Sequence, residues 1–171
     1  MKHTIPGDIK VIKYSKKYTK DLEECVEGLQ KYLASVDTFD LLYCPQNYGK
    51  KYVSQVLLKS VQGSKGVVFL ASVDAKIVGF VTGIIDKLPA EETLGYKKKL
   101  KAARVVDLYV DENCRGVGVG KFLLQTVEKY FVTKKCDQIK IEVYAPNKDA
   151  YKFYHGSGYQ TNSIDLVKKL K

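Results

Sequence analysis

The stretch "ENCRGVGVGKFLL", residues 112–124, joins a glycine-rich segment to an apolar run with helical spacing. Three glycines stand at alternate positions in it: Gly116, Gly118 and Gly120. Arg115 precedes the glycines and Lys121 follows them. The preceding residues, "ARVVDLYVDE" (103–112), are typical of a strongly apolar strand. The segment therefore predicts a strand, a glycine-rich turn and a helix in direct succession.

Such a turn is suited to binding a phosphate. The N-terminus of a helix leaves backbone N–H groups unpaired, and the helix dipole adds partial positive charge there. Glycine lets the backbone approach an anion closely and adopt a positive φ. Arg115 and Lys121 would add charge-assisted hydrogen bonds. A glycine-rich turn with no ligand is the structural alternative.

Two common nucleotide-binding patterns do not fit this turn. A P-loop requires a glycine where the chain has Arg115 and a hydroxyl residue where it has Phe122. The dinucleotide fingerprint GxGxxG requires its third glycine where the chain has Lys121. The pattern that does fit is Arg-x-x-Gly-x-Gly.

The rest of the chain predicts one domain over residues 1–171 with the order β-α-α-β-β-β-α-β-α-β-β. Before the turn we expect a strand at 8–14, helices at 18–37 and from Pro45 to about 61, a hairpin at 66–86, and a polar excursion at 87–101. After the turn we expect a helix to about Lys134, a strand at 138–146, a short helix in 147–159 that starts at Asn147, and two short strands in the tail.

Composition narrows the class of protein. Lys plus Arg exceeds Asp plus Glu by 29 − 19 = 10, which suits an anionic cofactor, nucleic acid or an acidic partner, or a lysine-rich solvated surface. No window resembles a membrane-spanning helix. Four cysteines without a CxxC pair and two histidines argue against a metal site. Reduced thiols in a cytoplasmic protein are the expectation.

Two motifs resemble the GNAT superfamily of N-acetyltransferases. The first is the Arg-x-x-Gly-x-Gly of Arg115, Gly118 and Gly120, which resembles that family's coenzyme A loop. The second is "NKDAYKFYHGSGY" (147–159), whose matching positions are Asn147, Ala150, Phe153, Tyr154, Gly158 and Tyr159. The order of the motifs and of the predicted elements also matches the family over nearly the whole chain.

The resemblance implies a mixed α/β (α+β) fold and a cofactor site. The expected sheet is central, twisted and mostly antiparallel, with six to seven strands, about four helices, and a splayed parallel pair at 103–111 and 138–145. Acetyl-coenzyme A would lie in the splayed gap, with no metal required. The implied cofactor-binding residues are Leu108, Tyr109, Val110, Arg115, Gly116, Val117, Gly118, Val119, Gly120, Lys121, Asn147 and Tyr154.

The resemblance also implies transfer of an acetyl group to a primary amine by direct attack in a ternary complex. The amine would belong to a small molecule or to a protein or peptide. Tyr154 matches the tyrosine that protonates the departing thiolate in many family members. Some family members carry a glutamate base on this strand. In some of them it stands where this chain has Val106, and in others at about the position of Arg104.

The base is therefore open between Asp107, Glu142 and a water molecule. Asp107 lies one residue away from the position of Val106, and one step along a strand turns a side chain to the other face of the sheet. A salt bridge or amine-binding role is the alternative for both carboxylates. At the level of function, the alternatives are a coenzyme A-binding regulatory protein without turnover and a basic nucleic-acid-binding module. Family members are often homodimers.

Overall fold

The central sheet has five strands within residues 8–86 and 100–170, the part of the chain that this computed structural model describes. Their order is β1-β2-β3-β4-β5, with every pair antiparallel except β4 and β5, which run parallel. The strands are β1 (Lys10–Lys13), β2 (Val67–Val73), β3 (Lys76–Ile85), β4 (Ala102–Val110) and β5 (Gln138–Ile141). The predicted hairpin at 66–86 is confirmed as β2 and β3, joined at Asp74 and Ala75, which both adopt positive φ.

The helical segments before β2 are η1 (Lys16–Tyr18), α1 (Thr19–Val36), α2 (Tyr48–Tyr52), η2 (Val53–Leu57) and α3 (Leu58–Gly63). Those after β4 are η4 (Glu112–Cys114), α4 (Val119–Thr133) and α5 (Lys148–Gly156). The second predicted helix is one continuous segment, from α2 to α3, in which η2 is a turn of π-helix. Apolar spacing predicts such a helix but does not predict the π turn within it.

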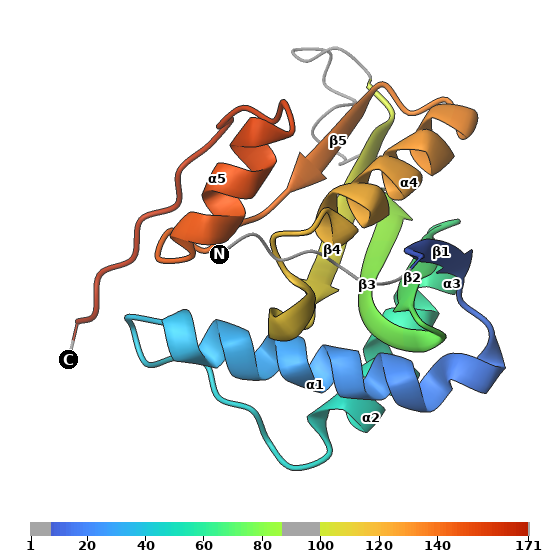
Figure 1. The fold of residues 1–171 in the computed structure, drawn as a ribbon. Helices are drawn as coiled ribbons and strands as arrows, with labels where there is room; N and C mark the ends of the chain where they lie inside the picture. The colour runs from blue at the N-terminus through green and yellow to red at the C-terminus, as the bar shows by residue number, and fades with distance from the viewer. Residues whose placement is uncertain (1–7, 87–99, 171) are drawn as a thin grey trace.

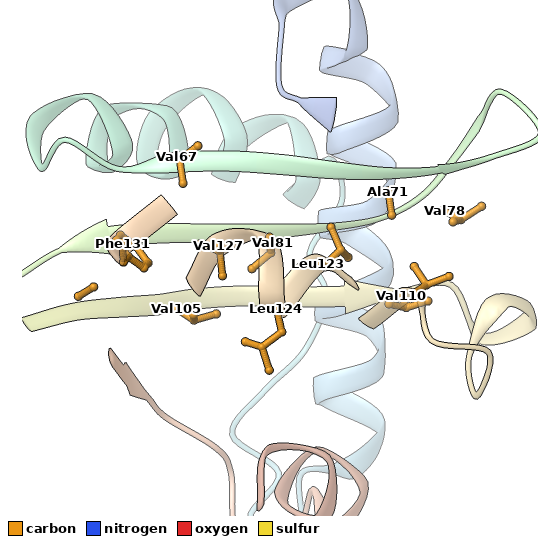
Figure 2. Close-up of a cluster of buried hydrophobic side chains, with 12 residues drawn as sticks. Val67, Ala71, Val78, Val81, Val105, Val110, Leu123, Leu124, Val127 and Phe131 are labelled. Carbon is orange, nitrogen blue, oxygen red and sulfur yellow. The ribbon is translucent and has the colours of Figure 1, made fainter. Parts of the chain in front are cut away.

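The helices cover both faces of the sheet (Figure 1). On one face, α1 and η2 pack against β2 and β3 around the fully buried Leu22 and Phe80. On the other face, α4 packs through Leu123, Val127 and Phe131, which Figure 2 shows among the valines of β2, β3 and β4. Side chains of α5 complete that second cluster. Each large apolar side chain buried there contributes about 1.5–3 kcal/mol.

Two expectations about the sheet are wrong. It has five strands in the described residues where six to seven were expected, because residues 159–170 form no strand there. The tail, residues 160–170, is exposed along its whole length and lacks the paired neighbour that a strand requires. The strand expected at 138–145 is also shorter, since β5 ends at Ile141.

Two further observations bear on the site. Most of the polar excursion at 87–101 lies outside the described residues. Within the described ranges, no helix is long and apolar enough to cross a membrane, and no three His, Cys, Asp or Glu side chains gather as metal ligands.

Candidate active site

The parallel strands β4 and β5 separate part of the way along β4. Their pairing runs from Ala102 opposite Gln138 to Val105 opposite Ile141. Beyond Val105, β4 continues to Val110 while β5 has ended (Figure 1). The backbone of residues 107–110 therefore has a strand partner in the described part only on its β3 side. This is the splayed pair that the sequence predicts, with a shorter paired section.

A β-bulge at Val106 marks the point of separation. Thr82 of β3 pairs with Asp107, and the next residue, Gly83, pairs with Val105, so Val106 has no partner in β3. The extra residue interrupts the side-chain alternation of β4. Val105 lies in the cluster under α4, whereas Asp107 reaches the opposite face and contacts Tyr52 of α2. Without the bulge, Asp107 would lie on the same face as Val105; with it, Asp107 lies on the face of α2.

Asp107 is held in a largely apolar environment. Burial raises the pKa of its carboxyl to about 6, although the Tyr52 hydroxyl opposes this shift by donating to the two carboxylate oxygens at 3.4 and 3.3 Å. Thr82, which is 1% exposed, also lowers the pKa of Asp107, as Tyr52 does. Its hydroxyl forms no hydrogen bond of normal geometry with any described residue. A carboxyl with this pKa changes charge close to neutral pH, as a general base requires.

Tyr154 lies on α5 and packs against the cluster under α4. Its half-buried ring meets Phe153 and Tyr159 edge-on, at centroid distances of 5.1 and 5.8 Å. Burial, and secondly the Asp107 charge, raise the pKa of Tyr154 to about 12. The ordinary pKa values of a tyrosine and a thiol lie closer together than the raised pKa of Tyr154 and that of a departing thiol. The negative charge of Asp107 is thus the second of the two causes that raise the pKa of Tyr154.

The other positions considered for a base have different surroundings. Glu142 is exposed and directly follows the end of β5. Val106 is exposed at the bulge. Arg104 forms an ion pair with Asp86, with a nitrogen–oxygen distance of 3.2 Å. Asp107 is the carboxylate that the fold partly buries beside the splayed strands.

The glycine-rich turn presents a row of backbone donors. Gly116 and Gly118 adopt positive φ values of 79° and 99°, and Gly118 is the N-cap of α4. The first helical hydrogen bond runs from the N–H of Phe122 to the carbonyl of Gly118, at 2.9 Å. None of the six N–H groups from Gly116 to Lys121 donates to a described residue. Gly120 lies inside α4 without positive φ, so the conformational argument applies only to the first two glycines.

Arg115 is held beside the end of β4. Its Nε donates to the Val110 carbonyl at 2.9 Å, and its guanidinium lies 4.5 Å from the centroid of the Tyr32 ring. The Tyr32 hydroxyl donates to Oδ1 of Asn147 at 3.2 Å. The same oxygen accepts from the Ala150 N–H at 3.1 Å, which confirms Asn147 as the cap of α5. Tyr32 thus connects the turn before α4 to the start of α5.

Three site residues were missed by the sequence analysis: Tyr32, Tyr52 and Thr82. Tyr52 falls in the apolar repeat of the second helix, which predicts a core residue. Thr82 is a polar residue in a strand of otherwise apolar composition, and this is the one signal that the sequence offered. The predicted backbone positions, Leu108, Tyr109 and Val110, do lie along the unpaired edge of β4. The side chain of Tyr109 turns towards α1, where a Cβ on Gly28 would lie 2.5 Å from its hydroxyl.

Three solved structures illustrate the fold. A mutant protein from Bacillus halodurans has a TM-score of 0.81 at 19% identity, covering 95% of this chain and 99% of that chain. A GNAT-family acetyltransferase from Staphylococcus aureus has a TM-score of 0.69 at 20% identity, covering 94% and 90%. AAC(6')-Iy, solved with the bisubstrate analogue CoA-S-monomethyl-acetylneamine, has a TM-score of 0.66 at 17% identity, covering 96% and 99%. The chain therefore shares the fold of these three structures over almost its whole length.

The sequence comparisons identify the family. The pattern of the Acetyltransferase (GNAT) family matches residues 34–159, most of the chain. The chain belongs to the GNAT acetyltransferase family, which confirms the resemblance of the two motifs. An uncharacterized N-acetyltransferase of Methanocaldococcus jannaschii is 29% identical over 97 residues, which are 56% of this chain and 54% of that protein. The match thus spans about half the length of this curated relative.

Proposed function

We propose that this protein transfers the acetyl group of acetyl-coenzyme A to a primary amine. The observation that supports the proposal best is the pair of titratable groups, Asp107 on β4 and Tyr154 on α5, in a GNAT-family chain whose strands β4 and β5 splay apart. One group has a pKa raised to about 6 and the other a pKa raised to about 12. Such a pair supplies a base and an acid for one transfer reaction.

The residues around the opening fit acetyl-coenzyme A. The six N–H groups of Gly116–Lys121, which donate to no described residue, would bind its pyrophosphate, with Lys121 adding charge. The backbone of Leu108–Val110 would pair with its pantetheine arm as an added strand does. Arg115 and Asn147 are held close to this turn and to the start of α5 by their contacts with Tyr32. When bound, acetyl-coenzyme A supplies the acetyl group as an activated thioester.

Asp107 and Tyr154 divide the proton transfers between them. The Asp107 carboxylate accepts the proton that the amine nitrogen loses, and the Tyr154 hydroxyl gives a proton to the leaving sulfur. Loss of the Asp107 negative charge removes one cause of the raised Tyr154 pKa, so proton uptake makes Tyr154 a stronger acid. Afterwards a proton passes from Asp107, with its pKa of about 6, to the phenolate of Tyr154, with its pKa of about 12. Both groups then regain their starting states.

We also propose that the chain acts as a homodimer. Four aliphatic side chains of the tail project into solvent: Ile164, Leu166, Val167 and Leu170. Apolar surface of this kind on a folded protein commonly marks a site of association. The start of the tail is fixed to its own chain, because Thr161 hydrogen-bonds with Tyr151 and His155.

Turnover and cofactor binding should be measured separately. The purified chain is incubated with acetyl-coenzyme A and a panel of primary amines, from small polyamines and aminoglycosides to lysine peptides, while free thiol is followed. We expect thiol release that depends on the amine. In parallel, coenzyme A alone should raise the thermal unfolding temperature. Stabilisation without turnover on any amine would favour a coenzyme A-binding regulator, and absence of both would contradict the cofactor assignment.

A further inference from the structure

Tyr52 occupies a fixed position at a junction in the second helical segment. It is the last residue of α2, and the π turn η2 begins at the next residue, Val53. Val53 and Leu57 are almost fully buried in the cluster around Phe80, which anchors this turn to the sheet. The Tyr52 ring stacks on Tyr48, with centroids 5.5 Å apart and planes at 16°. The backbone and the ring are therefore both held.

The direction of this side chain is specific. From that position the Tyr52 hydroxyl reaches both oxygens of the Asp107 carboxylate, on a strand 55 residues away. A π turn changes the helical register, so the residues on either side of it present different faces from those of a regular helix. The turn thus lets Tyr52 face Asp107 while Val53 and Leu57 face the core.

We propose that Tyr52, together with Thr82, is a positioning residue that holds the Asp107 carboxylate ready to accept the proton of the acceptor amine. The inference rests on the proposed function for its role in turnover. Tyr52 and Thr82 act through Asp107, from two different elements. One lies at the end of α2 and the other is the register partner of Asp107 on β3.

Thr82 supports this assignment independently of Tyr52. Its hydroxyl is almost fully buried and makes no hydrogen bond to any described residue. Leaving such a group without a partner costs about 1–3 kcal/mol. The charged carboxylate directly across the ladder is an acceptor of the kind that this donor lacks. A buried hydroxyl opposite a partly buried acid therefore indicates that the two act together.

The other groups around Asp107 are neutral at neutral pH. Burial and negative charge raise the pKa of Tyr48 and Tyr52 on α2, and of Tyr154 on α5. The same holds for Tyr109 on the strand itself. No described Lys or Arg forms an ion pair with Asp107. Within the described ranges, hydroxyl donors and no cation thus stabilise this carboxylate, and they leave it more basic than an arginine partner would.

The test measures the pKa of Asp107 directly. The carboxyl carbon of Asp107 is followed by NMR against pH in the cofactor-free chain, and Asp107→Asn assigns the signal. Removing a donor to the charged form should raise the Asp107 pKa, by about half a unit to one unit for Tyr52→Phe and in the same direction for Thr82→Val. Tyr48→Phe is the matched control, because it keeps the ring stack and removes a hydroxyl that donates no hydrogen bond to Asp107 in the described structure.

Activity supplies a second readout. The acid limb of kcat/KM against pH should move to higher pH in Tyr52→Phe by the same amount as the NMR pKa, with KM for acetyl-coenzyme A unchanged. An unmoved Asp107 pKa in Tyr52→Phe would overturn the proposal, and so would an equal shift in Tyr48→Phe. If the wild-type chain turns over no amine, the proposed function fails, while the NMR titration still decides whether Tyr52 positions Asp107.

Discussion

Asp107 is the residue on which the chemistry of this site depends. Its carboxyl is partly buried beside the splayed strands, whereas Glu142 is exposed beyond the end of β5. We predict that Asp107→Asn lowers kcat/KM by about a hundredfold or more, the usual contribution of a general base. Glu142→Gln should stay within about threefold of wild type. Thiol-release assays on the amine with the highest turnover decide between the two carboxylates, and the opposite ranking would transfer the role to Glu142.

The same residue should reduce the stability of the fold. The pKa of Asp107 rises from 3.8 in the unfolded chain to about 6 in the folded one. The folded state therefore binds the proton more tightly, and stability falls as pH rises through this window. Above it, Asp107→Asn should raise the free energy of unfolding by about 2–3 kcal/mol. Urea titrations at about pH 7.5 and pH 4 test this, because the gain should vanish at the lower pH; a gain of equal size at both would contradict it.

Tyr154 should act on turnover and leave binding almost unchanged. Its hydroxyl is placed to give a proton to the leaving sulfur, a step that occurs after both substrates are bound. We predict that Tyr154→Phe lowers kcat by about tenfold to a hundredfold with little change in the KM for acetyl-coenzyme A. Tyr151→Phe, on the exposed side of the same helix, is the control. Steady-state kinetics that show a loss mainly in KM would assign Tyr154 to cofactor binding.

Among the elements, the turn before α4 shows at which positions the backbone conformation requires a glycine. Gly118 has a φ of 99°, and a Cβ added there would meet open space, so the cost of Gly118→Ala is backbone strain alone. We predict a loss of about 1–2 kcal/mol in the free energy of unfolding. Gly120→Ala lies in the helix, where the added Cβ would be 3.5 Å from the Phe153 ring, so it should be neutral or stabilise by about 1 kcal/mol. Urea unfolding compares the pair, and equal effects would contradict this distinction.

The central strand shows what the sequence could and could not predict. Its apolar run predicts a strand at 103–111, and β4 spans Ala102–Val110. The bulge at Val106 leaves no mark in that pattern, because Val105 and Val106 are equally apolar and their difference arises from pairing with β3. Strict alternation therefore misjudges the face of every residue after Val106. Asp107 was recognised as a candidate, but its burial and its contact with Tyr52 depend on this one unpaired residue.

At the scale of the whole molecule, the site is assembled from both halves of the chain. Asp107 and the glycine-rich turn follow one another in sequence, but Tyr32 and Tyr52 come from α1 and α2, which lie on the other side of the sheet from α4 (Figure 1). The motifs identify the family because cofactor contacts are local in sequence. The surroundings of the base are long-range contacts, and a single sequence gives no means of pairing residues 52 and 107. The structure was needed for that part of the site.

The tail gives the prediction that belongs to the whole molecule. Leu166 and Leu170 are 87% and 86% exposed, and the described part of the chain offers them no apolar cover. If the tail forms the interface of a homodimer, the wild-type chain should sediment at about twice its mass of 19.3 kDa. Leu166→Asp should shift this equilibrium to the monomer, because a charge in an apolar interface is costly. Val132→Asp, at a 72% exposed position on α4, is the matched control and should leave the dimer intact. Sedimentation equilibrium over a range of concentrations measures both, and a monomeric wild type throughout, or equal dissociation by both variants, would contradict assembly through the tail.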